Sequence, residues 1–256
     1  VAQTVLFAGC TEKAKDPSEY PIPELVGTTV NVFNWGENIA DGSDGSLDIN
    51  KEFEKRFGIT VNYTNYDSNE AMYAKLKSGA VSYDVIIPSD YMIARMINEG
   101  MLMELDFDNI PNYANVDPAF KNTAFDPENK YSVPYTWGTV GIIYNKKVVD
   151  EEDLTGWELL WNEKYKNDIL MFDNSRDAFA IVQAMYGYDV NTTDPEILQI
   201  CADKLSEQQP LVQQYVMDQI YDAMIGGEAS IAPYYAGDAV SMIDENPDLG
   251  FYLPAH

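Results

Sequence analysis

Histidine is nearly absent from this chain, which has a single one, His256, at its last position. That leaves no His-based catalytic triad and no His-ligated metal site. The sequence has neither a Gly-rich phosphate loop nor a G-x-S-x-G turn. The segment DGSDGSLDINKE is acidic, but Ser46 occupies the position at which a calcium loop requires glycine. We therefore expect no enzyme, no metal and no cofactor; the enzyme class that stays open is a glycosidase with two carboxylates.

Basic residues are also scarce. Lysine and arginine total 16 against 42 aspartates and glutamates, which gives a formal net charge of −26. Such a surface repels nucleic acid and anionic membranes, because it has no basic stripe to replace counterions. It attracts cations. The alternative is that the acidic surface only keeps a secreted protein soluble.

Long apolar runs and cysteines are few. No apolar run reaches 18 residues, so no segment of the sequence is predicted to span a membrane. The hydrophobic fraction of 46% is normal for a globular protein, and 256 residues suit one large domain or two ordinary ones. The two cysteines, Cys10 and Cys201, are too few for a disulfide framework. Cys201 lies in a helical pattern, where a lone cysteine is usually a small buried hydrophobe.

The segment VLFAGC, which ends at Cys10, resembles the tail of a bacterial lipoprotein signal peptide. The resemblance implies that Cys10 is a lipidation site and that a lipid is the chain's one attachment to a membrane. The alternative is an N-terminal tail with an incidental cysteine. The sequence begins at Val1, without a Met or a basic region before the apolar run. It ends with the strand-like segment DLGFYLPAH. We therefore expect a fragment at both ends.

Strand and helix signals alternate along the first half of the chain. Ile49, Phe53 and Phe57 recur every four residues and predict one face of a helix. Asp67 and Glu70 have the spacing of a capping box at the start of another helix. The alternation predicts an open parallel sheet. Its predicted strands are 29–33, 59–63 and 84–88, the last buried on both faces, and its helices end near Gly58, Gly79 and Gly100.

After residue 100 the pattern of strand and helix signals loosens into a loop over residues 101–129. A second alternation of strands and helices then begins. Residues 131–145 predict two strand-like runs joined near Trp137. Phe179, Val182 and Tyr186 are predicted to share one face of a helix. Further elements are a short helix at 157–161, strands at 169–172 and 229–235, and helices at 176–186, 219–227 and after an Asp194 cap with Pro195.

We interpret the chain as an α/β protein with a two-lobed architecture. Residues 1–27 are predicted to hold the signal remnant and a linker. Lobe 1 spans 28–135, a hinge crossing spans 136–138, and lobe 2 spans 139–251. Residues 252–256 would begin a return crossing.

Aromatic rings and carboxylates follow the predicted strands, at the edge where open parallel sheets bind ligands. Purely structural roles stay open for some of these residues. Ser89 and Asp173 are good helix caps, and only one of Tyr234 and Tyr235 can face a cleft, so the other belongs to the core. The residues that follow the strands include Trp35, Glu37, Ser89, Asp90, Tyr91, Asp173, Asn174, Arg176, Asp177, Tyr234, Tyr235 and Asp238, and the crossing adds Tyr135 and Trp137.

This chemistry suits an organic cation. An ammonium is attracted to the face of Trp or Tyr by roughly 0.5–2 kcal/mol per contact. A carboxylate pairs its charge through hydrogen bonds of about 1.5–3 kcal/mol. Two such ends with aromatic walls between them give roughly micromolar affinity, about −8 kcal/mol, after ordering costs.

Several segments resemble one family in order along the chain: NWGE, YDSNEAMYAKLKSGAVSYDVIIPSDY, YSVPYTWGTVGIIYN, FDNSRDAF and NTTDP. They resemble the bacterial spermidine/putrescine-binding proteins of ABC importers. The resemblance implies a two-lobed periplasmic-binding-protein fold, type II-like and here truncated at the C-terminus. It implies an extracytoplasmic monomer that captures a polyamine between its lobes and delivers it to permease subunits.

By position, the resemblance assigns ligand-binding residues to both lobes. Gly36, Asn38 and Asn174 depart from relatives, and Tyr235 stands where the family often has tryptophan. The alternative is a binding protein of the same fold for an amino acid, a sugar or another cation. The assigned residues are Trp35, Glu37, Ser89 and Tyr91 in lobe 1 and Asp173, Asn174, Asp177, Tyr235 and Asp238 in lobe 2.

Overall fold

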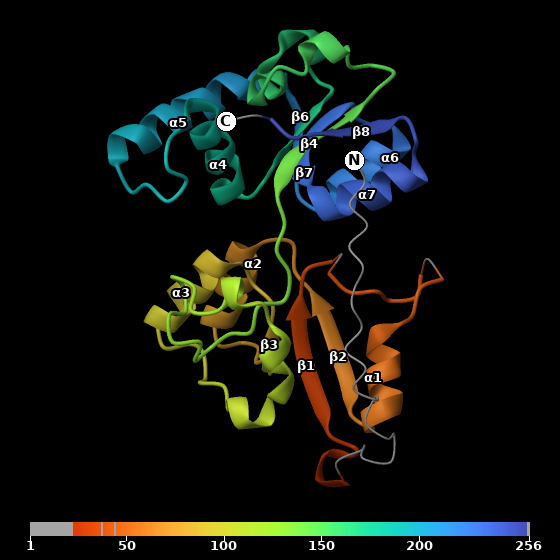
Figure 1. The fold of residues 1–256 in the computed structure, drawn as a ribbon, viewed down its shortest axis with the longest axis vertical. Helices are drawn as coiled ribbons and strands as arrows, with labels where there is room; N and C mark the ends of the chain where they lie inside the picture. The colour runs from red at the N-terminus through yellow and green to blue at the C-terminus, as the bar shows by residue number, and fades with distance from the viewer. Residues whose placement is uncertain (1–22, 37, 44, 255–256) are drawn as a thin grey trace. The chain divides into compact units, whose positions relative to one another are not determined.

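The computed structural model describes residues 23–36, 38–43 and 45–254. The chain divides into two compact units, one ending at Met92 and the other beginning at Ile93. Figure 1 shows the helices and strands of both units. The predicted lobe boundaries near 135 and 139 stay a prediction. Cys10 and Glu37 lie outside the described residues.

The first unit is built on a parallel sheet of three strands in the order β2–β1–β3. The central strand pairs with β2 along its whole length and with β3 over two residues. Because all three strands run the same way, their carboxyl ends share one edge of the sheet. The strands are β1 (Thr29–Asn34), β2 (Thr60–Asn65) and β3 (Val85–Ile86), which confirms the predicted β-α-β-α-β order.

Helix α1 (Ile49–Phe57) lies beside β2 (Figure 1). It ends as predicted at Gly58, whose φ of 68° is the left-handed conformation that glycine adopts without steric cost. The rings of Phe53 and Phe57 are 4.6 Å apart, as expected for one helical face.

Two details of the first unit differ from the predictions. Helix α2 (Asn69–Lys77) is capped by Ser68, whose side chain accepts from the Ala71 N–H, and not by Asp67. Strand β3 is not buried on both faces: Val85 is 46% exposed, because β3 is a two-residue strand at the edge of the described sheet.

Residues 99–139 form a loop with short 3-10 helices, in keeping with the predicted loosening. It follows α3 (Asp90–Asn98), which confirms the helix predicted before Gly100. Between residues 131 and 138, all of them described, there is no strand, so the first of the two predicted strand-like runs is wrong. The 3-10 helices are η3 (Phe107–Asn109), η4 (Pro111–Asn115) and η5 (Pro118–Phe120), and η2 (Pro23–Leu25) precedes β1.

Asp126 holds this loop together. Its side chain is 3% exposed, and its carboxylate accepts from the N–H groups of Lys130, Tyr131 and Ser132 and from the Ser132 hydroxyl at 2.9–3.0 Å. Burial alone would raise the pKa of Asp126, but these hydrogen bonds outweigh it and lower the pKa below its ordinary value. The ionised carboxylate therefore stabilises the segment that leads to Tyr135 and Trp137.

We expect Asp126→Asn to cost about 3 kcal/mol of unfolding free energy at pH 7, because hydrogen bonds to a charged acceptor are lost. A lowered folded-state pKa means that this stability is present above the unfolded pKa of about 3.9 and is lost as pH falls through the folded pKa. Urea unfolding at pH 7, 5 and 3 should thus show the difference between variant and wild type shrinking at pH 3. Asp117→Asn, at an exposed cap in the same loop, is the control. A difference that is absent at pH 7 or constant with pH contradicts this account.

The second unit is built on a mixed sheet of five strands in the order β6–β5–β7–β4–β8. Strands β5, β6 and β7 are parallel, and β4 is antiparallel to β7 and β8. The carboxyl ends of β5, β6 and β7 therefore share one edge with the start of β4. The bounds are β4 (Val140–Asn145), β5 (Ile169–Phe172), β6 (Val212–Val216), β7 (Ile231–Tyr235) and β8 (Leu249–Tyr252).

Four α-helices cover this sheet. In Figure 1, α4 lies beside α5 and α6 beside α7, and the strands separate the two pairs. Asp194 caps α5 as predicted, and Cys201 on α5 is fully buried, also as predicted. The helices are α4 (Ser175–Tyr186), α5 (Pro195–Gln208), α6 (Gln219–Gly226) and α7 (Ala236–Glu245), with 3-10 helices η6 (Glu151–Asp153), η7 (Trp157–Trp161), η8 (Glu163–Tyr165) and η9 (Gln209–Leu211).

The buried face of α4 is offset from the predicted one. Ala178, Ile181 and Val182 are buried, whereas Tyr186 is 44% exposed. The core of this unit lies between the sheet and the helices and includes Ile142, Ile143, Leu160, Met171, Phe172, Tyr234 and Met242.

Candidate functional site

Trp35 follows directly after β1, at the carboxyl edge of the first sheet. Its ring packs against Tyr66 at a centroid distance of 4.7 Å and an angle of 53°. Tyr66 is 5% exposed and donates its hydroxyl to the Ile87 carbonyl at 2.6 Å. Buried Asn34 accepts from the Trp35 N–H at 2.8 Å and from the Asn38 side-chain amide at 3.3 Å. The indole is thus held on a fixed base and stays half-buried.

Asn69 joins Ser89 and Tyr91 at the same edge. Its side chain is fully buried. Its amide nitrogen donates to the Ser89 hydroxyl at 3.0 Å and to the Tyr91 hydroxyl at 2.9 Å, and its oxygen accepts from the Ser89 N–H at 3.1 Å. The Tyr91 hydroxyl donates to a Glu70 carboxylate oxygen at 3.0 Å. The structure therefore brings Ser89 and Tyr91 together through one buried amide.

Asn69 and Glu70 were not predicted as site residues, and Glu70 was assigned to a helix cap. Both follow strand β2, whose carboxyl end lies at the same edge as those of β1 and β3. The rule that ligands bind beyond the carboxyl ends of parallel strands, applied to β2 as it was to the other two strands, would have selected them. The acid predicted in this lobe, Glu37, lies outside the described residues, and the Glu70 carboxylate accepts from the Tyr91 hydroxyl.

Tyr235 and Asp177 form a pair at the carboxyl edge of the second sheet. The Tyr235 hydroxyl donates to Asp177 Oδ2 at 2.8 Å. The Tyr235 ring stacks on Phe172 at 5.3 Å and 27°. Tyr234 points the other way and is 1% exposed, as strand alternation requires, so of the two tyrosines it is the core residue. Loss of solvent, and then the charge of Asp177, raises the pKa of Tyr235. Its hydroxyl is therefore a neutral donor at physiological pH.

Asn174, not Asp173, caps α4. The Asn174 side-chain oxygen accepts from the N–H groups of Arg176 and Asp177 at 2.9 and 3.4 Å, and the residue is 4% exposed. The alternative in which Asp173 is the cap is therefore wrong. Asp173 has an exposed side chain, and its N–H donates to the Val216 carbonyl at 3.1 Å. The predicted contact of Asn174 with an amine stays a prediction.

Two further acids belong to the same edge. Asp238 is half-buried in the first turn of α7, one helical turn after Tyr235. Asp218 lies two residues after strand β6, and neither was predicted from the sequence. Its charge also contributes to the raised pKa of Tyr235. Asp173, Asp177, Asp218 and Asp238 thus follow the ends of β5, β6 and β7, and the charges of Asp177 and Asp218 act on Tyr235.

The segment before β4 adds aromatic surface. Tyr135 and Trp137 are 58% and 70% exposed, and the Trp137 ring lies 5.2 Å from that of Phe120. The Ala236 N–H donates to the Thr139 carbonyl at 2.9 Å, which ties this segment to the start of α7.

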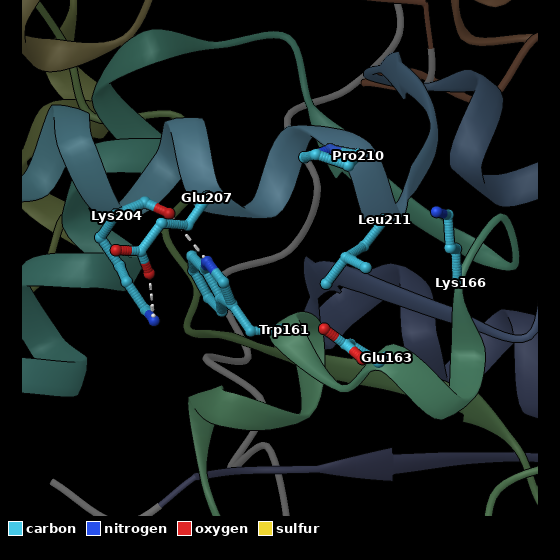
Figure 2. Close-up of a pocket in the computed structure, with 7 residues that line it drawn as sticks. All are labelled: Trp161, Glu163, Lys166, Lys204, Glu207, Pro210 and Leu211. Atoms are coloured by element: carbon cyan, nitrogen blue, oxygen red, sulfur yellow. Dashed lines mark hydrogen bonds and ion pairs between the residues drawn. The ribbon is translucent and has the colours of Figure 1, made fainter.

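A cavity of 410 Å³ lies elsewhere in the second unit (Figure 2). The Trp161 indole donates to the Lys204 carbonyl at 2.9 Å, and the Lys204 ammonium pairs with Glu207 at 2.8 Å. Because Lys166 and Lys204 balance Glu163 and Glu207 in its lining, the cavity lacks the unbalanced negative charge found at the strand edge. It is lined by Trp161, Glu163, Lys166, Lys204, Glu207, Pro210 and Leu211, none of which is a predicted site residue.

The sequence model of one protein family, the bacterial extracellular solute-binding proteins, matches residues 48–255. The chain belongs to this family. Solute-binding proteins of this kind are components of transporters and not a family of enzymes. None of the helices in the described part of the chain is long and apolar enough to cross a membrane.

Relatives of this solute-binding protein carry polyamine names. It is 36% identical over 214 residues to the spermidine/putrescine-binding periplasmic protein of Salmonella typhimurium, covering 82% of this chain and 59% of the relative. It is 33% identical over 250 residues to the spermidine/putrescine-binding periplasmic protein 1 of Haemophilus influenzae, covering 97% and 68%. The chain therefore spans about three fifths of the length of the Salmonella relative.

A solved structure agrees with the fold. A putative spermidine/putrescine ABC transporter protein from Listeria monocytogenes superimposes with a TM-score of 0.79 at 38% identity, covering 89% of this chain and 68% of that one. Together with the two α/β units, this confirms the predicted fold class, the α/β fold of two-lobed periplasmic binding proteins.

Proposed function

We propose that the protein binds a polyamine, putrescine or spermidine, outside the cytoplasm and delivers it to permease subunits of an ABC importer. The names of the relatives at 33–36% identity support this. They are longer than this chain, so the substrate and the partners belong to the proposal. It includes no enzymatic activity, no nucleic-acid binding and a monomeric protein.

The observation that carries the proposal is the Tyr235–Asp177 pair among the acids at the end of β5, β6 and β7. A primary ammonium carries three N–H donors and one charge, and carboxylates are its natural acceptors. An anionic solute would be repelled by this edge, and a neutral sugar would leave its charge uncompensated. The edge therefore favours a cation.

The first unit supplies a different chemistry. Trp35 offers an aromatic face that suits methylene groups and the cation attached to them. Ser89 and Tyr91 present hydroxyl oxygens fixed by Asn69. We propose that these residues, with Glu37, contact the other part of the polyamine.

Calorimetric titration of the full-length protein with putrescine, spermidine, arginine and maltose tests the proposal. We expect putrescine or spermidine to bind with a dissociation constant of roughly 1 μM, about −8 kcal/mol, and maltose to give no heat of binding. Heat from maltose alone, or from arginine in preference to both polyamines, would overturn the polyamine assignment.

Binding is also proposed to close the protein about the crossing at residues 136–138, as in other two-lobed binding proteins. We expect the radius of gyration measured by small-angle scattering to decrease when putrescine is added. Maltose at the same concentration is the control and should leave it unchanged. An unchanged radius at saturating putrescine rejects closure without touching the assignment of the ligand.

Attachment of the protein to a membrane through a lipid on Cys10 remains part of the proposal. It depends on the VLFAGC segment, which lies outside the described residues.

A further inference from the structure

Tyr235 is fixed in place by three neighbours. Its ring stacks on Phe172 at 5.3 Å and lies 5.5 Å from the ring of Tyr234. Its backbone is paired with Val140 of β4. As the last residue of β7 and the N-cap of α7, it has little conformational freedom left, so its hydroxyl marks a fixed point at the sheet edge.

Asp177 comes from a different element. It lies in the first turn of α4, where its N–H donates to the capping oxygen of Asn174 at 3.4 Å. That bond fixes the backbone but leaves rotation about the side-chain bonds. The hydrogen bond from the Tyr235 hydroxyl at 2.8 Å restricts that rotation. A carboxylate offers about four lone-pair sites, and the tyrosine uses one of them.

We propose that Tyr235 is a positioning residue that holds the Asp177 carboxylate in the orientation in which it receives the ligand's ammonium group. This inference rests on the proposed function. It goes beyond the predicted role of Tyr235 as a ligand-binding residue, because the hydroxyl acts on the ligand through Asp177. A carboxylate that is oriented before binding loses less side-chain entropy when the ammonium arrives, and this raises affinity.

The neutral state of Tyr235 supports this role. Its surroundings raise its pKa, so the hydroxyl keeps its proton and donates throughout the physiological range. A tryptophan at this position could supply an aromatic face, but it has no hydroxyl at the tip of its ring. A tryptophan side chain at position 235 would therefore not reproduce the contact with Asp177 in the same place.

A double-mutant cycle on the full-length protein tests the inference, with putrescine as the titrant. Tyr235→Phe removes one oxygen and keeps the ring on Phe172, and we expect it to weaken binding about tenfold. In the Asp177→Ala background the same change should have less than about a twofold effect, because the side-chain oxygens that the hydroxyl holds are gone. Tyr234→Phe, in the neighbouring core residue, is the matched control and should bind like the wild type. Thermal unfolding of each variant checks that the fold is kept.

The outcomes separate the two proposals. If the wild type gives no heat with putrescine or spermidine, the proposed function fails and the inference falls with it. If the wild type binds and Tyr235→Phe binds equally well, the inference alone is overturned. If Tyr235→Phe weakens binding by the same factor in both backgrounds, the hydroxyl does not act through Asp177, and the inference is again overturned.

Discussion

Asp177→Asn is expected to weaken putrescine binding about 100-fold, because a charge-assisted hydrogen bond to ammonium is worth about 1.5–3 kcal/mol. Asn174 holds the backbone N–H of Asp177, and the Tyr235 hydroxyl holds its carboxylate. Asparagine keeps the size of the side chain but removes its charge. A desolvated ammonium that faces it is left uncompensated, which is costly in a site that excludes water. Calorimetry gives the dissociation constant directly.

The control for this variant is Asp222→Asn. Asp222 is an exposed aspartate on α6, in the same unit but at a helix surface, and its neutralisation changes the net charge equally. We expect it to change affinity less than about twofold, because exposed charges are screened by salt. If both variants lose affinity alike, the long-range field of the acidic protein attracts the ligand and Asp177 is not a specific contact.

Trp35→Ala is expected to weaken putrescine binding about 20-fold, because the cation–π contact contributes about 0.5–2 kcal/mol and the apolar face that covers the methylenes is lost as well. Trp35 lies on Tyr66, so the structure offers one face of the indole to packing and leaves the residue half-buried. Titration calorimetry with putrescine measures the change.

Trp35→Phe is the companion variant. It keeps an aromatic face on Tyr66, so we expect it to lose less than half of the binding free energy that Trp35→Ala loses. If the role of Trp35 is structural alone, the unfolding temperature of both variants is lowered. Trp35→Ala that unfolds at the wild-type temperature and binds putrescine with wild-type affinity removes Trp35 from the site.

Much of the fold was predictable because its local signals agree with its tertiary structure. Strand 169–172 is buried at every position, and its apolar run was assigned to the residue. The Asp194–Pro195 start of α5 is specified by its own side chains. Strand β6 was missed because VQQYV is a mostly exposed edge strand with glutamines at its centre, so that neither alternation nor an apolar run marks it.

The position of the candidate site residues after the strands was predictable, and their contacts were less so. The rule that ligands gather beyond carboxyl ends of strands selected Trp35, Asp177 and Tyr235 without any structure. The rule could not predict that Asn174 caps α4, since Asp173 and Asn174 are both good capping residues. The backbone conformation determines which of the two is the cap. The role of the buried Asn69 amide could not be predicted either, because its contact with Ser89 depends on the strand order β2–β1–β3.

The most direct test of the central claim is a crystal structure of the full-length protein with putrescine. The account predicts one ammonium within about 3.2 Å of the Asp177 carboxylate, with the Tyr235 hydroxyl still on its other side, and methylenes against the Trp35 ring. Putrescine bound anywhere that touches neither Asp177 nor Trp35 would contradict it.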